Sequence, residues 1–196
     1  EYIYPNILYG KTFFSEKFGT LDFKSNVLRS NYETNKYKTF LTNDIIWNPS
    51  SYITKNGFVN SLEGMLRNTN YEARKTNEYK DEGTVNELSG VLGYKSSLPM
   101  KKDGINYSNL FIPNFMLRYA PGHMRNLSGK DVLLSYTSLY TLNKTSEIED
   151  GLSAILGFDF KTKEKESGKE KLSLSFGQVF NYEKNKDMPT KSSLDQ

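Results

Sequence analysis

The feature that most constrains this chain is an alternation of apolar and polar residues along unusually long stretches. It is clearest in KLSLSFGQVFNY, residues 171–182, where apolar side chains occupy one parity and mostly small or polar ones the other. Because successive side chains of a strand point to opposite faces, this stretch is predicted to be a strand with one apolar and one polar face. Alternation alone does not say whether the apolar face contacts a protein core or lipid.

Similar segments recur along the whole chain, each bounded by clusters of Gly, Pro, Asn, Asp, Ser or Lys. They are roughly 10 to 16 residues long, whereas strands of soluble sheets are typically about 5–6 residues and a tilted membrane-crossing strand needs about 9–11. The predicted strands cover residues 2–14, 19–32, 37–48, 58–73, 84–97, 109–120, 132–143, 152–164 and 171–183. We therefore expect an all-β fold, an antiparallel meander of about nine long strands with the first and last at its edges.

Composition narrows the class of protein. The chain has 26 Lys and Arg against 23 Asp and Glu, and the two signs are interleaved, so no basic surface for nucleic acid is expected. The absence of cysteine excludes disulfides and thiolate metal sites within these residues. Hydrophobic residues make up only 36% while aromatics make up 14%, a pairing found in β-sandwiches with aromatic binding faces and in outer-membrane barrels with polar lumens.

Two further patterns concern the membrane and the extent of the chain. No window approaches about 18 consecutive apolar residues, so a transmembrane helix is not expected. The chain opens directly in a predicted strand, without the pattern of a signal peptide, and closes in the loop-like NKDMPTKSSLDQ. We therefore expect residues 1–196 to be a single segment of a larger barrel domain, with no complete domain boundary inside.

Residues able to support catalysis or bind a metal are few. The single histidine, His123, follows a Pro-Gly turn and has no Cys or second His to complete a metal site. The acidic segment SEIEDG could offer Glu147, Glu149 and Asp150 to Ca²⁺, but it lacks EF-hand spacing, and an acidic turn between strands is favoured. No nucleophile, base and orienting group can be assembled, so neither an enzyme activity nor a cofactor or metal is expected.

Three segments, in order along the chain, carry a resemblance to a known family. SLPMKKDGINYSNLFIPNFMLRYAPG (97–122) is a Pro-containing strand running into a YAPG turn. LYTLNKTSEIEDGLSAILGFDF (139–160) is an Asn-containing acidic connection with an acidic-x-Gly step at Glu149 and Gly151. LSLSFGQVFNY (172–182) places Gly177 and Gln178 before an apolar pair. Together they resemble the barrel region of the LPS-assembly outer-membrane family LptD.

There is one departure from the family pattern. The acidic connection of the family often carries Asp-Arg before its Glu, whereas this chain has Thr145, Ser146 and Glu147 at the equivalent place. Any salt bridge made by that Arg is therefore absent here or replaced by another pair.

The resemblance implies a large antiparallel barrel of roughly two dozen strands in the cell outer membrane. It implies a protein that is not an enzyme and that inserts lipopolysaccharide into the outer leaflet. The implied partners are lipopolysaccharide, an outer-membrane lipoprotein seated in the lumen and a periplasmic bridge protein that delivers the lipid. The residues by themselves leave two alternatives open: another large outer-membrane barrel such as a receptor or porin, and a secreted carbohydrate-binding β-sandwich.

In a barrel of this kind, the alternation would assign the residues of the last two strands to lipid or to lumen. The expected lipid-facing residues are Leu152, Leu156, Phe158, Phe160, Leu172, Leu174, Phe176 and Phe180. The expected lumen-facing residues are Ser153, Asp159, Ser173, Ser175 and Asn181. Gln178 lies on the apolar parity and is expected near a membrane interface or turned inward by a bulge beside Gly177. Ile155 lies on the polar parity, where a lumen or a second layer could hold it.

Overall fold

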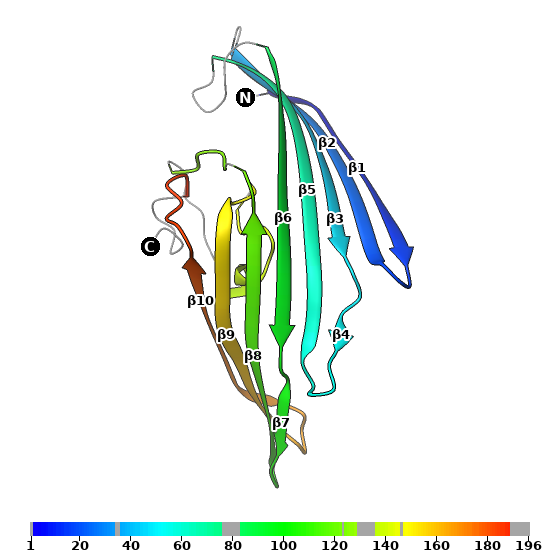
Figure 1. Cartoon of the computed structure of the whole chain (residues 1–196), viewed down its shortest axis with the longest axis vertical. Helices are drawn as coiled ribbons and strands as arrows, with labels where there is room; N and C mark the ends of the chain where they lie inside the picture. The colour runs from blue at the N-terminus through cyan, green and yellow to red at the C-terminus, as the bar shows by residue number, and fades with distance from the viewer. Residues whose placement is uncertain are drawn as a thin grey trace. The chain divides into compact units, whose positions relative to one another are not determined.

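The computed structural model describes residues 2–33, 36–75, 83–122, 124–128, 136–145 and 147–188 (Figure 1). Within these residues the strands are β1 (Tyr2–Ser15), β2 (Gly19–Glu33), β3 (Lys36–Asn48), β4 (Tyr52–Ile53), β5 (Val59–Arg74), β6 (Thr84–Ser97), β7 (Met100–Asp103), β8 (Tyr107–Ala120), β9 (Gly151–Glu164) and β10 (Glu170–Asn181), and the helix is α1 (Tyr136–Leu139). No helix in the described part of the chain has the length and apolar character needed to cross a membrane.

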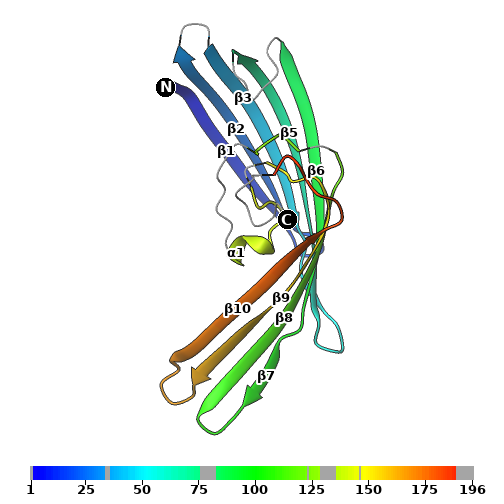
Figure 2. The same cartoon turned by 90° about the vertical axis from the view of Figure 1, so that its left-hand side faces the viewer.

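The described strands belong to one antiparallel sheet in the order β1-β2-β3-β5-β6-β8-β9-β10, with β4 beside β5 and β7 beside β8 (Figure 2). With the short β4 and β7 set aside, strands that follow one another along the chain are therefore neighbours in the sheet, and β1 and β10 end the order. The predicted all-β antiparallel meander is confirmed. By its contacts the chain divides into two compact units, residues 1–50 with 64–91 and residues 51–63 with 92–196.

In the first unit, β1, β2, β3 and the adjoining part of β5 pair without crossovers. The turn from β1 to β2 depends on Gly19, whose φ is +76° and whose place leaves no room for a side chain, because a Cβ there would lie 2.3 Å from the Asn48 carbonyl oxygen. Across the next pair of strands, Arg67 donates to both carboxylate oxygens of Asp44 at 2.7 and 2.8 Å. One face of this unit thus carries a bidentate ion pair.

In the second unit, β8, β9 and β10 run side by side over almost their whole length. Ala120 pairs with Gly151 at one end of the β8–β9 ladder and Tyr107 with Glu164 at the other. We call the face that carries Arg118, Ser153 and Asp159 the polar face of these three strands. The opposite face, which we call the aromatic face, carries a row of rings from all three strands.

Two short strands lie where the sequence predicted only connections. The β3–β5 connection contains β4, and residues 98–108 contain β7, which pairs with β8 from Met100–Phe111 to Asp103–Ser108. Pro49 and Pro99 explain why the long strands stop short of these pieces, since a proline has no N–H to give to the ladder. The chain resumes pairing just beyond each proline.

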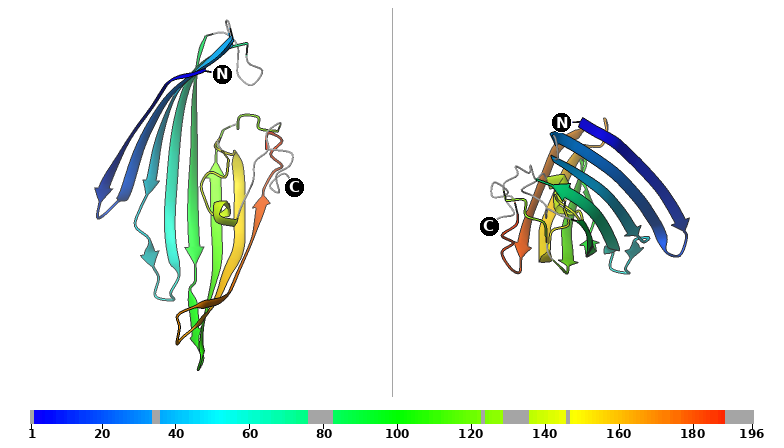
Figure 3. Two further views of the ribbon diagram at one scale, coloured as in Figure 1. Left: turned by 180° about the vertical axis from the view of Figure 1, so that it is seen from behind. Right: turned by 90° about the horizontal axis from the view of Figure 1, so that it is seen from above.

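The predicted strand at 132–143 is wrong. Residues 136–139 form α1, and residues 132–135 lie outside the described residues. Tyr136, Leu139 and Tyr140 share the i, i+3, i+4 spacing of one helical face. This face lies against β9 and β10, and Figures 1 and 3 show α1 beside β9 from opposite sides. The alternation in this segment is weak, and the packing of its tyrosine and leucine side chains on the sheet favours a helix over a strand.

The side chains of α1 and of the residue after it pack over two glycines that are cross-strand partners. Gly157 of β9 is the cross-strand partner of Gly177 of β10. A Cβ on Gly157 would lie 2.1 Å from the Phe176 carbonyl oxygen and 2.2 Å from the Tyr140 hydroxyl, and a Cβ on Gly177 would lie 2.8 Å from Leu139 Cδ1. The close approach of β10 and α1 therefore requires glycine at position 157, whereas a side chain at position 177 would overlap only the flexible end of Leu139.

Replacing Gly157 with Ala should destabilise the folded protein by about 1–3 kcal/mol, because the new methyl group overlaps a backbone oxygen that cannot move away cheaply. The measurement is urea unfolding of the protein reconstituted in lipid. Gly10→Ala is the matched control, since Gly10 is also a strand glycine and its Cβ would meet nothing closer than 3.8 Å. Equal unfolding midpoints for the two variants would show that β10 and α1 do not approach Gly157 this closely.

Candidate functional site

The β8–β9 connection, over its described residues 121–122, 124–128, 136–145 and 147–150, covers part of the polar face. Its Met124 and Leu127 form a buried cluster with Met188 from the segment after β10, and Val179 of β10 packs against this cluster. The backbone N–H of Leu127 donates to the Asp187 carbonyl at 2.7 Å. The connection and residues 182–188 thus form one layer over the strands.

This layer explains the apolar residues that break the alternation. Met116 of β8 and Ile155 of β9 are cross-strand partners on the polar face, and both are fully buried at 0% exposure. By contrast, Leu156 and Phe176 on the aromatic face are 50% and 54% exposed. Of the two alternatives for Ile155, a lumen or a second layer, its full burial favours the layer.

Arg118 ties this layer to β8. Its side chain is 1% exposed, and its guanidinium donates from Nε to the Leu142 carbonyl at 2.6 Å and from Nη2 to the Glu149 carbonyl at 2.5 Å. Burying a charge is costly unless it is hydrogen-bonded, and here two backbone oxygens supply those bonds. One arginine thus fixes both ends of residues 142–149 on the strand.

Lys144 and Glu149 close the same loop from inside. Glu149 accepts from the Lys144 backbone N–H at 2.7 Å and from the Lys144 ammonium at 3.3 Å, and both residues are buried. Burial lowers the pKa of the Lys144 ammonium, and the charge of Glu149 opposes that shift. Because the carboxylate also holds a backbone N–H, losing it would leave two buried donors without an acceptor.

The other two carboxylates of the acidic segment are also engaged. Arg125 pairs with Glu147 at 3.1 Å, and Asn185 donates to Asp150. Glu147 is thus paired with an arginine from elsewhere in the layer. Among the described residues no three His, Asp or Glu side chains converge as they would around a metal ion. His123 lies outside the described residues.

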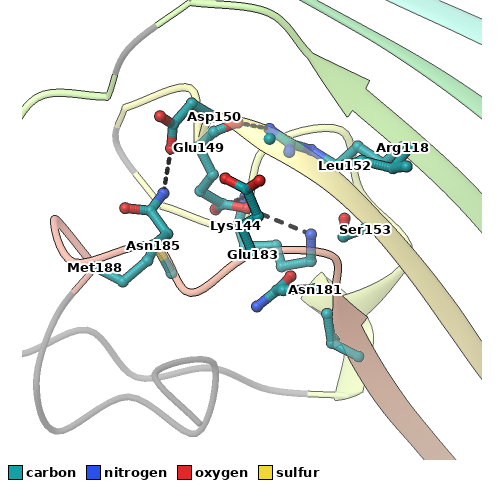
Figure 4. A pocket seen from close by; sticks show the side chains of 12 residues that line it. Arg118, Lys144, Glu149, Asp150, Leu152, Ser153, Asn181, Glu183, Asn185 and Met188 are labelled. Carbon is teal, nitrogen blue, oxygen red and sulfur yellow. Dashed lines mark hydrogen bonds and ion pairs between the residues drawn. The ribbon is translucent and has the colours of Figure 1, made fainter.

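A small cavity of about 20 Å³ lies within this cluster (Figure 4). Arg118, Lys144, Ser153 and Asn181 are among its lining residues, and the buried Ser153 hydroxyl has no hydrogen-bond partner there. A water molecule needs roughly 10–15 Å³ of such volume, so the cavity fits about one water and no lipid or sugar. The cluster around Arg118 therefore holds the layer on the strands and does not form a substrate pocket.

The structure sorts the predicted face residues of β9 and β10 onto two sides of the sheet. Cross-strand pairs such as Ser175 with Asp159 and Asn181 with Ser153 share the polar face, and Phe176 with Phe158 and Phe180 with Ala154 share the aromatic face. Ser173 follows the same parity as Ser175, and the apolar set Leu152, Leu156, Phe158, Phe160, Leu172, Leu174, Phe176 and Phe180 follows the other.

The four family-motif residues are not brought to one place. Glu149 and Gly151 line the small cavity, and Gly177 lies under α1. Gln178 points to the aromatic face, opposite Leu156, and the β9–β10 register shifts only between Glu170 and Leu172. The alternative of a bulge beside Gly177 is therefore wrong, and a position near a membrane interface stays a prediction. The Gln178 amide donates to the Val179 carbonyl at 3.1 Å.

Sequence reasoning missed the residues that fasten the layer. Arg118 shares the parity of Met116 and Ala120, so a charge on an otherwise apolar strand face was the available signal. Lys144 carried no signal, because a lysine beside an acidic turn normally reads as solvated. Tyr136 and Tyr140 were assigned to a strand that does not form.

Glu149→Gln should loosen the layer, because it removes the charge that satisfies both donors of Lys144. Amide hydrogen exchange in peptides covering residues 136–145 should become at least about tenfold faster, equivalent to about 1.4 kcal/mol. Glu183→Gln is the control, since Glu183 lines the same cavity but is exposed. Unchanged exchange in Glu149→Gln would show that the ion pair does not hold the connection in place.

Comparison with known proteins identifies the family. The sequence model described as LptD, LPS transport system D, matches residues 13–196. No curated protein matches the chain. The matched range includes the three resembling segments and the whole Arg118 cluster, and it favours lipopolysaccharide transport over the receptor, porin and secreted-sandwich alternatives. The chain therefore belongs to the LptD family, outer-membrane proteins that transport and assemble lipopolysaccharide.

Proposed function

We propose that this chain is one stretch of barrel wall along which lipopolysaccharide passes to the outer leaflet without any covalent bond being made or broken. In this proposal all 196 residues belong to the barrel domain, with no complete domain boundary among them. The observation that carries it is the division of β8, β9 and β10 into an aromatic and a polar face. The family match supports the same reading.

The physical problem is the amphipathic nature of the lipid. Its sugars and charged groups would have to shed water to enter hydrocarbon, which costs several kcal/mol for each unsatisfied polar group. A wall with a wet inner side and an apolar outer side lets the sugars stay hydrated while the acyl chains remain in the membrane. No nucleophile, metal or cofactor is needed for this, and we propose that the protein has no enzymatic activity.

The aromatic face is proposed to contact lipid. Phe111, Phe158 and Phe176 form a row across β8, β9 and β10, with ring centroids 5.5 and 5.9 Å apart. The flanking leucines of β10, Leu172 and Leu174, are about half exposed, and such a wide apolar surface is costly in water. In a bilayer the same surface is favourable.

The polar face is proposed to line the lumen. Asp159 accepts from Asn114 at 2.8 Å and from Ser175 at 2.6 Å, so a hydrogen-bonded polar network runs across the three strands. On this side we place the partners: a lipoprotein seated in the lumen, and a periplasmic bridge that delivers the lipid. These partners rest on the likeness to the LptD family.

The two faces can be tested by thiol labelling, because these 196 residues contain no cysteine and any cysteine elsewhere in the protein can be replaced by serine. In the intact protein in its membrane, Ser175→Cys should react with a water-soluble maleimide, while Leu174→Cys and Phe176→Cys on the opposite parity should resist it. The three positions are consecutive along β10, which makes them matched controls for one another. Equal labelling of all three would mean that this sheet does not separate lipid from water.

A charge on the aromatic face should be costly. Leu156→Arg should destabilise the barrel by about 2–4 kcal/mol if this position lies near the bilayer midplane. Urea unfolding in lipid vesicles measures the difference. Ser173→Arg, on the exposed polar parity, is the control and should change the unfolding free energy little. Two equal losses of stability would contradict the assignment of the faces.

The function is tested by depleting the parent protein in its own cell and measuring lipopolysaccharide at the surface. Surface lipopolysaccharide should fall while the mass of the lipid that accumulates inside stays that of the mature molecule, since no bond changes. Normal surface lipopolysaccharide together with loss of uptake of a nutrient would instead identify a receptor or porin.

A further inference from the structure

A second cavity, separate from the Arg118 cluster, lies between α1 and the sheet of the second unit. It measures about 410 Å³ and opens to the polar face, and its walls come from β5, β6, β8, β9 and α1. Its lining residues include Ser97, Asn114, Asp159, Tyr136 and Tyr140. Its volume lies in the range of small-molecule sites, about 300–1,000 Å³, unlike the single-water cavity beside Arg118.

Two tyrosines from α1 and the residue after it form the aromatic wall. The rings of Tyr136 and Tyr140 meet edge to face, with centroids 5.9 Å apart. The buried Tyr140 hydroxyl has no hydrogen-bond partner among the described residues, although it lies against Gly157. Burial raises the pKa of both phenols, so each remains a neutral hydroxyl able to donate at physiological pH.

The opposite wall carries hydroxyl, amide and carboxylate groups. Ser97 of β6 is the cross-strand partner of Asn114 of β8, and Asn114 donates to Asp159 of β9. The ammonium of Lys95, which also lines the cavity, is paired with Glu63 at 2.5 Å. The cavity therefore offers many hydrogen bonds, and the one cation among its described lining residues already has an anionic partner.

This chemistry selects among the parts of a lipopolysaccharide. An acyl chain would leave the polar wall without partners, which costs about 1–3 kcal/mol for each buried group. A phosphate would meet the Asp159 carboxylate and find only an ammonium already paired. A sugar ring fits both walls, because its C–H face can stack on a tyrosine ring while its hydroxyls bond to Asn114, Asp159 and Ser97.

We propose that this cavity is a binding subsite for the saccharide rings of lipopolysaccharide during transit, with Tyr136 and Tyr140 as the stacking wall and Asn114 and Asp159 as the hydrogen-bonding wall. The proposal rests on the proposed function, in which the polar face lines the lumen. Transit requires that binding be weak enough for release, and a cavity that is open on one side meets this requirement.

The test places a photo-crosslinking side chain at Ser97 in the full-length protein in its native membrane. Ser173 is the control position, since it shares the polar parity but does not line the cavity. Each is irradiated in cells that make complete lipopolysaccharide and in cells whose lipopolysaccharide is truncated to its innermost sugars. Crosslinking to complete lipopolysaccharide should be stronger at Ser97 than at Ser173, and truncation should abolish that difference.

A second variant isolates the stacking wall. Tyr136→Leu removes the partly exposed aromatic ring, and it should lower crosslinking at Ser97 about two- to tenfold, as expected for one lost stacking contact, without changing crosslinking at Ser173. An unchanged unfolding midpoint confirms that this variant is folded.

The outcomes distinguish the saccharide subsite from the assignment of the polar face to the lumen. Crosslinking at Ser173 but not above that level at Ser97 would overturn the saccharide subsite and leave the lumen assignment intact. No lipopolysaccharide crosslink at either position would contradict both. A crosslink from Ser97 to a protein would show that the cavity is a contact for a partner and would overturn the proposal, as would equal crosslinking to complete and truncated lipopolysaccharide.

Discussion

The second unit depends on the buried guanidinium of Arg118. Its two hydrogen bonds to the Leu142 and Glu149 carbonyls fix the β8–β9 connection over the polar face of its own sheet. Once that layer is fixed, Met116 and Ile155 can be buried on a face that is otherwise polar. The layer also positions α1, whose tyrosines form one wall of the large cavity. The site near α1 thus depends on an arginine that does not line it.

Two faces and one added layer account for the whole arrangement of β8 to β10. The aromatic face carries rings in contact from strand to strand and has no covering layer among the described residues. The polar face is half covered by the connection and half lined by hydroxyl, amide and carboxylate groups. In a barrel that moves an amphipathic lipid, such a wall gives separate surroundings to sugar and to acyl chain. The transport then depends on surfaces and not on a reacting group.

The long strands and their order followed from the sequence, because alternation over a dozen residues leaves a strand as the only element that buries one face. The layer did not. Its contacts join residues far apart in sequence, such as Leu127 with Asp187 and Arg118 with Glu149, and no local sequence pattern predicts such contacts. The segment around Tyr136 was assigned to a strand because the seat for its helical face, Gly157 and Gly177, lies on strands that come later in the chain.

The proposed transport requires that the aromatic face contacts lipid and that the polar face does not. Fluorescence quenching by brominated lipids tests this in the intact protein, with Trp47 and any tryptophan outside these 196 residues replaced by Phe and one tryptophan introduced at Phe176 or at Ser175. We expect strong quenching for Phe176→Trp and weak quenching for Ser175→Trp. Equal quenching at these adjacent positions would contradict it.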